Sequence, residues 1–481
     1  MPSSRLLSLF SAATIALSLT NTYAATNISS TQKTDRIIIK FKKNESASSS
    51  SSNNSSSTHA QMLRMGFKPL HKTVSGAQVY NLGELIDVSK VNEFTEQLAN
   101  TTSDVEYAEP DYIMTALNTP DDPMYNQQWA YFDTKGGINA EEAWDMTTGK
   151  MPSGESVVVA VIDTGVRPHG DLKENLLQGY DFISDAWAAN DDNGRDSNAY
   201  DTGDAIKAGE CGTDGNGNPY PSYDQSSSWH GTHVAGTIAA VGNNSFGVSG
   251  VAWNAKVLPV RVLGKCGGYT SDITDGMMWA AGIDVDDVPR NTHPAQVINL
   301  SLGGYSKCSR TYQNAISAIR ARGTTIVVAA GNSDDNARDY TPASCDGVVT
   351  VAATNKKGFR ANYSNYGSVV DVAAPGGETS WMSKTGGILS TLNAGDSEPG
   401  EDNYDYYQGT SMAAPHVAGT AALLYAINPD LSPSAVERIL KSTAREFPGC
   451  YTRGCNNICT EDTCGTGIID AGEAVKKAKY Y

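Results

Sequence analysis

Short β-branched apolar runs alternate with stretches of helical spacing through most of the chain. These runs cover residues 157–162, 257–263, 297–300, 325–330, 348–353 and 369–373. Apolar runs of this length, separated by helices, are typical of parallel strands that are covered on both faces. The pattern predicts an α/β domain, with a mainly parallel β-sheet flanked by helices, from about residue 119 onward.

Polar residues and glycines follow three of these runs directly. Asp163-Thr-Gly follows the first run, Ser301-Leu-Gly-Gly the third and Gly331-Asn332 the fourth. The carboxyl ends of parallel strands meet at one edge of a sheet, and ligands bind outside that edge. We therefore expect these three segments to contribute to one site.

Composition excludes several other classes of protein. The 481 residues carry a net charge of −17, and the acidic excess lies entirely after Leu117. Because binding to a phosphate backbone requires a basic surface, we expect no nucleic-acid partner. The length suggests two to four folding units.

Residues 1–24 read as a secretory signal with Arg5, an apolar core at 6–19 and a small-residue cleavage site. The alternative, a membrane anchor, needs about 20 apolar residues, more than this core offers. We therefore expect a secreted, extracellular protein without a membrane anchor. All eight cysteines lie after residue 210, and export favours their pairing as disulfides.

The cysteine-free segment from 25 to 118 predicts a small α+β pro-region. Residues 36–41 and 105–113 are strand-like, and residues 91–98 have helical spacing. The Ser- and Asn-rich run at 46–57 predicts a loop. An ordinary N-terminal domain is the alternative.

Ser411 stands at the start of one of two small-residue helices. Its segment reads Gly409-Thr-Ser-Met-Ala-Ala-Pro-His416, and helical spacing continues to Ile427. A hydroxyl at a helix start lies near free N–H groups and the positive end of the helix dipole, which stabilise a developing oxyanion. Ser411 is therefore a candidate nucleophile, unless it only caps the helix.

A serine nucleophile needs a base that a third group orients. The other small-residue helix starts with His230-Gly-Thr-His233, where His230 has the freer position. Asp163, at a strand end, is the carboxylate best placed to accept the imidazole N–H. Zinc is an alternative for the histidine pair, but the pattern differs from H-E-x-x-H. Asp163-Thr-Gly and Asp201-Thr-Gly also suggest an aspartic protease, but only the first follows a strand.

Three segments, in the order Asp, His, Ser, resemble the secreted bacterial subtilisin-like serine proteases, the subtilases. They are Val161-Ile-Asp-Thr-Gly165, His230-Gly-Thr-His-Val-Ala-Gly236 and Gly409-Thr-Ser-Met-Ala-Ala-Pro-His416. The resemblance implies a subtilisin-like catalytic domain at 119–481 that cleaves proteins through an acyl-enzyme. It also implies that residues 25–118 are a propeptide that assists folding, inhibits the enzyme and is removed by self-processing. We expect a monomer.

The resemblance also assigns roles to single residues. Ser411 would attack the scissile carbonyl, His230 would take its proton, and Asp163 would hold the imidazole. Asn332 would donate to the oxyanion. Two extended segments would hold the substrate backbone between them; their residues are Ser301, Leu302 and Gly303 on one side and Gly267 and Gly268 on the other.

Calcium is the cofactor that the resemblance implies. The loop from Gly242 to Val248 resembles the calcium loop of the family, with expected ligands Asp122, Asp171, Gly242, Asn244, Phe246 and Val248. A second acidic stretch suggests another cation site because its carboxylates would repel one another; the expected ligands are Asp191, Asp196, Asp201 and Asp204. A merely solvated acidic loop is the alternative.

The cysteines depart from the family pattern, and their positions in the chain suggest two disulfides. Cys308 and Cys345 follow the substrate segment and the strand after Asn332, so we expect them to pair, and likewise Cys211 with Cys266. The pairing of Cys450, Cys455, Cys459 and Cys464 stays open. Two rival functions remain. A catalytically silent subtilase-like protein would lack part of the triad, whereas an α/β-hydrolase would carry Gly-x-Ser-x-Gly and a different residue order.

Overall fold

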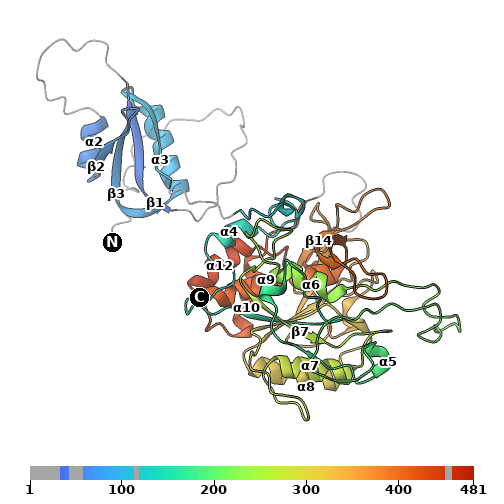
Figure 1. Cartoon of the computed structure of the whole chain (residues 1–481). Helices are drawn as coiled ribbons and strands as arrows, with labels where there is room; N and C mark the ends of the chain where they lie inside the picture. Colours follow the sequence, from blue (N-terminus) through green and yellow to red (C-terminus); the bar gives the residue numbers. More distant parts are fainter. Residues whose placement is uncertain (1–32, 43–57, 113–118, 450–457) are drawn as a thin grey trace, which may run out of the picture. The chain divides into compact units, whose positions relative to one another are not determined.

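The computed structural model describes residues 33–42, 58–112, 119–449 and 458–481. The chain divides into two compact units, residues 1–116 and 117–481 (Figure 1). The expected signal at 1–24 and the Ser- and Asn-rich run at 46–57 lie outside the described residues. No helix within the described ranges is both long and apolar enough to cross a bilayer.

The N-terminal unit is a small α+β fold, as the sequence predicts. Its antiparallel sheet has the order β2-β3-β1-β4. In chain order its elements are β1 Lys33–Phe41, α2 Thr58–Arg64, β2 Lys68–Lys72, β3 Gln78–Asp87, α3 Val88–Thr101 and β4 Val105–Pro110. Apolar side chains of β1 and α3 form its core, including Ile37, Ile39 and Val91. Sequence reasoning missed α2, β2 and β3. The residues of β2 are all exposed and carry no apolar alternation.

A seven-stranded parallel sheet forms the centre of the larger unit, with the order β13-β12-β10-β8-β5-β7-β6. Its strands are β5 Val158–Asp163, β6 Tyr180–Asp181, β7 Lys256–Arg261, β8 Val297–Leu300, β10 Thr325–Ala329, β12 Val349–Thr354 and β13 Val372–Pro375. Six of these overlap the apolar runs of the sequence, although β13 shares only Val372 and Ala373 with the run at 369–373. The predicted parallel α/β sheet is therefore confirmed, and only the two-residue β6 was missed.

Helices cover both faces of this sheet (Figure 1). One core joins α4 Ala140–Trp144, α6 His230–Ala239, α9 Thr410–Ile427, α10 Pro433–Thr443 and α12 Ala471–Lys479 to strand residues such as Val159 and Val161. The other joins α7 Thr270–Ala280 and α8 Arg310–Ala321 to Ala160 and Ile162. Neighbouring residues of β5 enter opposite cores because side chains alternate along a strand.

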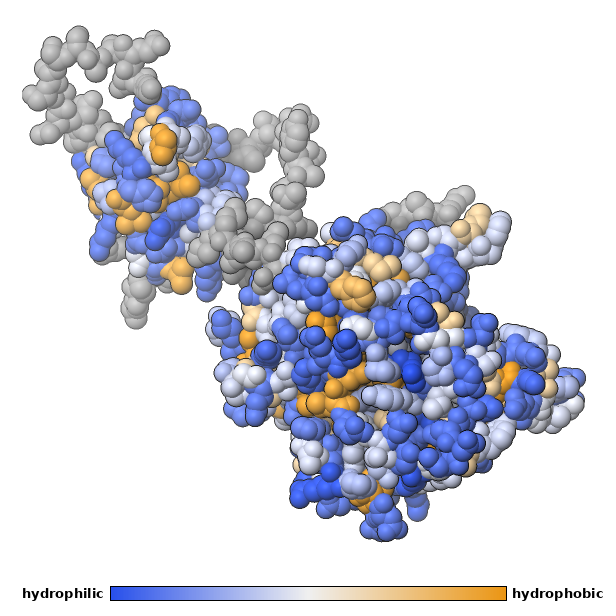
Figure 2. Space-filling view, viewed as in Figure 1, coloured by the Kyte–Doolittle hydropathy of each residue, from blue (hydrophilic) through white to orange (hydrophobic). Residues whose placement is uncertain are grey.

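Shorter elements complete the unit. They are α5 Ala186–Ala189, α11 Glu461–Cys464, the pair β9 Gly304–Tyr305 and β11 Tyr340–Thr341, the hairpin β14 Ile388–Asn393 and β15 Asp402–Tyr407, and the 3₁₀ turns Tyr125–Gln127, Lys173–Asn175 and Ala337–Asp339. In Figure 2 the visible surface of this unit is mostly hydrophilic, with small apolar patches between.

Three disulfides join described cysteines. Cys211 pairs with Cys266 and Cys308 with Cys345, so both expected pairings are confirmed, and Cys459 pairs with Cys464. Cys450 and Cys455 lie outside the described residues.

Candidate active site

Asp163 ends strand β5 and is completely buried. Its Oδ1 lies 2.7 Å from His230 Nδ1 and accepts the Thr164 N–H at 2.8 Å. A buried carboxylate favours the charged form of a neighbouring imidazole. Burial alone would lower the pKa of His230, but the charge and hydrogen bond of Asp163 outweigh it and raise that pKa above its ordinary value.

His230 is held in this position by a close approach between helix α6 and the end of β5. The next residue, Gly231, has no room for a side chain, because a Cβ there would lie 2.1 Å from the Gly165 carbonyl oxygen. The Gly231 N–H donates to Thr164 Oγ1 at 3.0 Å. Thr164, the residue after Asp163, thus bonds to Gly231, the residue after His230. This bond helps to hold Asp163 and His230 next to each other.

Ser411 is the second residue of helix α9. The helix follows Gly409, whose φ of 155° lies in the region that favours glycine. The Ser411 hydroxyl donates to the Ser301 carbonyl at 3.2 Å, and no hydrogen bond to His230 is formed within the described contacts. Nucleophile and base are often separated by more than a hydrogen bond before substrate arrives.

Pro415 shapes the start of α9 because it has no N–H to donate to the carbonyl four residues earlier, that of Ser411. The Ser301 hydroxyl donates to this carbonyl instead, at 2.8 Å. Asn299 on strand β8 in turn donates its amide to Ser301 Oγ at 2.9 Å. The end of β8 is therefore tied directly to the backbone of Ser411.

Asn332 lies just beyond strand β10. Its Oδ1 accepts both the N–H and the hydroxyl of Thr410, at 2.8 and 2.9 Å. With the amide oxygen occupied in this way, the Nδ2 hydrogens are the part of the side chain left to donate. Asn332 and Ser411 line the same cavity of about 440 Å³.

Two other histidines of this unit, His233 and His416, are held elsewhere. His233 Nε2 lies 3.0 Å from the Ile388 carbonyl, and burial lowers the pKa of this imidazole to about 3. His416 bonds to the Met412 carbonyl within its own helix. His230 and His233 therefore have separate partners, and the described residues contain no group of three or more His, Cys, Asp or Glu side chains fit to hold a metal. The zinc alternative has no support here.

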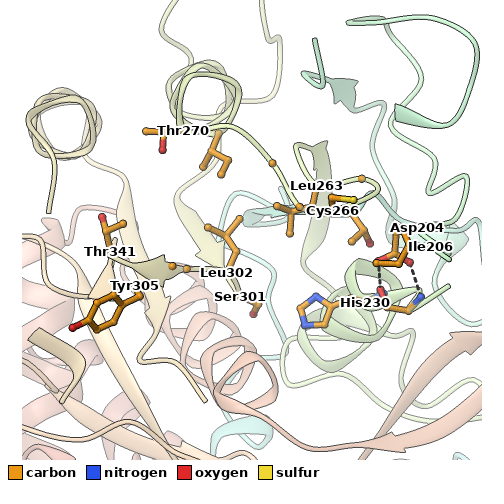
Figure 3. Close-up of a pocket in the computed structure, with 18 of the residues that line it drawn as sticks. Asp204, Ile206, His230, Leu263, Cys266, Thr270, Ser301, Leu302, Tyr305 and Thr341 are labelled. Carbon is orange, nitrogen blue, oxygen red and sulfur yellow. Dashed lines mark hydrogen bonds between the residues drawn. The ribbon is translucent and has the colours of Figure 1, made fainter. Parts of the chain in front are cut away.

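A cleft of about 720 Å³ extends from His230, with Gly267 and Gly268 among its lining residues (Figure 3). Residues Ser301–Gly303 line both this cleft and the 440 Å³ cavity. The two segments expected to hold a substrate backbone are therefore brought together beside His230. In Figure 3, Asp204, Ile206 and Cys266 lie near His230 on one side, and Tyr305 and Thr341 lie on the other.

Sequence reasoning missed part of the cleft wall. Ile206, Tyr220, Gln225 and Ser226 line the cleft and belong to the long segment before α6. The signal that points to this segment is Cys211, since its disulfide to Cys266 joins the segment to the neighbour of Gly267.

The loop from Gly242 to Val248, which follows α6, contacts Asp122 and Asp171, the two carboxylates expected to bind calcium. Asp171 Oδ1 accepts the Asn244 amide at 2.9 Å and its Oδ2 accepts the Val248 N–H at 2.8 Å, while Asp122 accepts the Asn243 N–H at 2.8 Å. Burial, with the nearby charge of Asp122, raises the pKa of Asp171 to about 6. Within the described contacts neither carboxylate is paired with a basic side chain, so the donor set fits a hard cation.

The second acidic stretch is not arranged around one point. Asp191 lies 3.0 Å from the guanidinium of Arg261, Asp196 accepts the Asn198 N–H, Asp201 accepts the Thr164 hydroxyl, and Asp204 accepts the N–H and hydroxyl of Ser228. Arg261 is itself buried and also pairs with Asp181. Sequence reasoning treated this stretch as a cation site because it could not see that β7 brings in Arg261 as the counter-charge.

The chain thus has a serine, a histidine and an aspartate at one edge of a parallel sheet, in the setting of a serine peptidase. Residues 154–467 match the model of the subtilase family. The chain is 48% identical over 86% of its length to an extracellular protease of Xanthomonas campestris and 45% identical over 83% to an extracellular basic protease of Dichelobacter nodosus. It spans 66% and 62% of the lengths of these relatives.

Among solved structures, a protease from Pseudoalteromonas arctica is 56% identical. It matches 75% of this chain and 100% of its own with a TM-score of 0.69. The chain belongs to the subtilase family. Its fold class is therefore the subtilisin-like α/β fold that the sequence predicts.

Proposed function

We propose that the protein is a secreted serine endopeptidase that is made as a self-processing precursor. The observation that carries the proposal is the pairing of buried Asp163 with His230, which lines a cleft that shares Ser301–Gly303 with the cavity lined by Ser411 and Asn332. The names of the two relatives, both described as extracellular proteases, support secretion.

In the proposed mechanism Ser411 Oγ attacks the scissile carbonyl carbon and His230 Nε2 accepts its proton. Asp163 holds the Nδ1–H and stabilises the imidazolium that forms. The oxyanion is stabilised by Asn332 Nδ2 and by the N–H groups at the start of α9. His230 then gives the proton to the leaving amine, and water releases the acyl group from Ser411.

The substrate backbone pairs as an extended strand between Ser301–Gly303 and Gly267–Gly268. Pairing through main-chain groups reads the peptide with little regard to its side chains, so the proposed activity is broad. Residues 25–118 act as folding aid and inhibitor until they are cleaved off. The mature enzyme is a monomer.

We propose that Ca²⁺ is held by the carboxylates of Asp122 and Asp171, the side chain of Asn244 and the carbonyls of Gly242, Phe246 and Val248. When bound, the ion supplies positive charge that offsets two buried carboxylates. It joins the loop after α6 to the chain segment that contains Asp122, and it has no part in the chemical step.

A fluorophosphonate probe tests the proposal on the full-length chain. We expect the probe to label Ser411 in the matured wild-type enzyme, as seen by mass spectrometry of peptides, and casein to be hydrolysed. Ser411→Ala should stay an unprocessed precursor without activity, and Ser317→Ala, on the exposed face of α8, should behave as the wild type.

A small amount of wild-type enzyme added to the Ser411→Ala precursor shows whether that variant is folded. A folded precursor releases a protease-resistant catalytic unit, whereas an unfolded one is degraded throughout. Self-maturation of Ser411→Ala, or casein hydrolysis by it, would refute the mechanism. A wild-type protein that is neither labelled nor active would point to the silent subtilase-like alternative.

A further inference from the structure

Asp204 is the one formally charged side chain, apart from His230 when protonated, among the described residues that line the 720 Å³ cleft. The other lining residues are neutral polar, apolar or glycine. Asp204 lies in the segment that forms the wall beside His230, as Figure 3 shows. The proposed peptidase function does not use this carboxylate.

Two hydrogen bonds fix the position of the Asp204 carboxylate. Oδ1 accepts the Ser228 N–H at 2.6 Å and Oδ2 accepts the Ser228 hydroxyl at 2.7 Å. Ser228 lies two residues before His230, and its Oγ accepts the His230 N–H at 3.3 Å. Because a carboxylate has about four lone-pair sites, this arrangement leaves acceptor capacity on both oxygens.

No basic side chain neutralises Asp204 among the ion pairs of the described residues. Lys207 and Lys265 line an adjoining cavity of about 430 Å³ together with Glu210 and Asp224, and not the cleft. Buried Asp201 lies close enough to Asp204 for the two carboxyl groups to interact, but burial raises the pKa of Asp201 to about 7, so near neutral pH it carries only part of a negative charge. The charge of Asp204 reaches the imidazole as well, since it helps raise the pKa of His230. This wall of the cleft is therefore electronegative.

The direction of an extended substrate decides which of its side chains meets this wall. Ser301–Gly303 separate the 440 Å³ cavity beside Ser411 from the cleft beside His230. Successive side chains of an extended peptide point to opposite sides. If the residue before the scissile bond fills the cavity, the residue one position earlier faces the wall with His230, Ser228 and Asp204.

We propose that Asp204 makes this enzyme prefer a lysine or arginine at the second residue before the cleaved bond. A lysine or arginine side chain there would donate hydrogen bonds to the free lone pairs of a carboxylate that is already held in place, so little ordering is needed. A glutamate there would meet uncompensated negative charge. The inference rests on the proposed peptidase function and adds a charge preference to an otherwise broad specificity.

Peptides that differ only at that position test the proposal. With matured wild-type enzyme, kcat/KM for the lysine peptide should exceed that for the glutamine peptide by about three- to five-fold, as for a partly exposed ion pair. The glutamate peptide should be the poorest of the series. The lysine preference should shrink when NaCl is raised to about 1 M, because salt screens exposed charges.

Asp204→Asn should bring the lysine-to-glutamine ratio close to one, whatever happens to overall activity. The matched control is Asp224→Asn, which removes a charge from the same segment but away from the cleft, where Asp224 accepts the Ala208 N–H. This control should keep the wild-type ratio.

A wild-type ratio near one, or a ratio that survives in Asp204→Asn, would overturn the proposal. The salt dependence in the wild type tests it even if Asp204→Asn does not mature. Failure of the peptidase function itself looks different, because then none of the peptides is cleaved.

Discussion

The hydrogen bond from Ser301 to the Ser411 carbonyl should contribute measurably to stability. Ser301→Ala removes the hydroxyl that donates to this carbonyl and leaves the Asn299 amide without its acceptor. Each unpaired buried group costs about 1–3 kcal/mol. Because water can reach the cleft side of Ser411, we take the lower end for each, which gives about 2 kcal/mol in total.

For a unit that spans residues 117–481, this loss lowers Tm by about 2–3 °C. The assay is calorimetry of enzyme that a sulfonyl fluoride has inactivated, so that self-digestion does not distort the transition. Ser317→Ala makes the same chemical change on an exposed helix, where the hydroxyl bonds to Gln313 in its own helix. This control should leave Tm within the error of the measurement.

Pro415→Ala sharpens the test, because residue 415 then has an N–H for the Ser411 carbonyl. In that background Ser301→Ala should cost only about 1 kcal/mol, so the two substitutions should show a coupling of about 1 kcal/mol. Equal Tm losses in both backgrounds would refute the argument that Pro415 creates the need for Ser301.

Three further predictions concern metal, pH and disulfides. EDTA should lower the Tm of the wild type by a few degrees, because removing bound calcium would lose about 3 kcal/mol of stabilisation. The Tm of Asp171→Asn should respond much less to EDTA. An unchanged Tm in the wild type would argue against calcium. Because His230 must be neutral to act as base and Asp163 raises its pKa, kcat/KM should fall on acidification at a pH above the ordinary imidazole value of 6.5; a fall centred below 6.5 would contradict the raised pKa. Replacing Cys308 and Cys345 by alanine opens a link of 37 residues and should cost about 3–4 kcal/mol of unfolding free energy in urea, and an unchanged midpoint would show that the link is not formed.

Much of the larger unit follows from local sequence. Strands such as β5 and β8 are buried on both faces, so their residues read as short continuous apolar runs. The helices α6 and α9 read as small-residue stretches because they pack closely on the sheet. Asp163, His230 and Ser411 stand out because each lies at the end of such an element.

Other features could not be read in this way. β2 has no apolar pattern because all of its residues are exposed. The acidic stretch before α6 suggested a cation site, whereas Arg261 lies far away in sequence and reaches Asp191 only through the packing of β7. Likewise, nothing in the sequence places Asp204 or Ile206 in the cleft wall.

The sequence alone determined the parallel α/β class, the order of the strands along the chain and the residues that carry the proposed chemistry, because burial and helix starts leave local patterns. Only the tertiary structure decided which groups meet. Beyond the pairing of Asp163 with His230, which the sequence already suggested, it brought the Ser301 hydroxyl to the Ser411 carbonyl, gave Arg261 to the acidic stretch and left Asp204 facing the cleft. Hydrogen bonds and charge pairs depend on distances in space, and residues far apart in the chain carry no local sign of them.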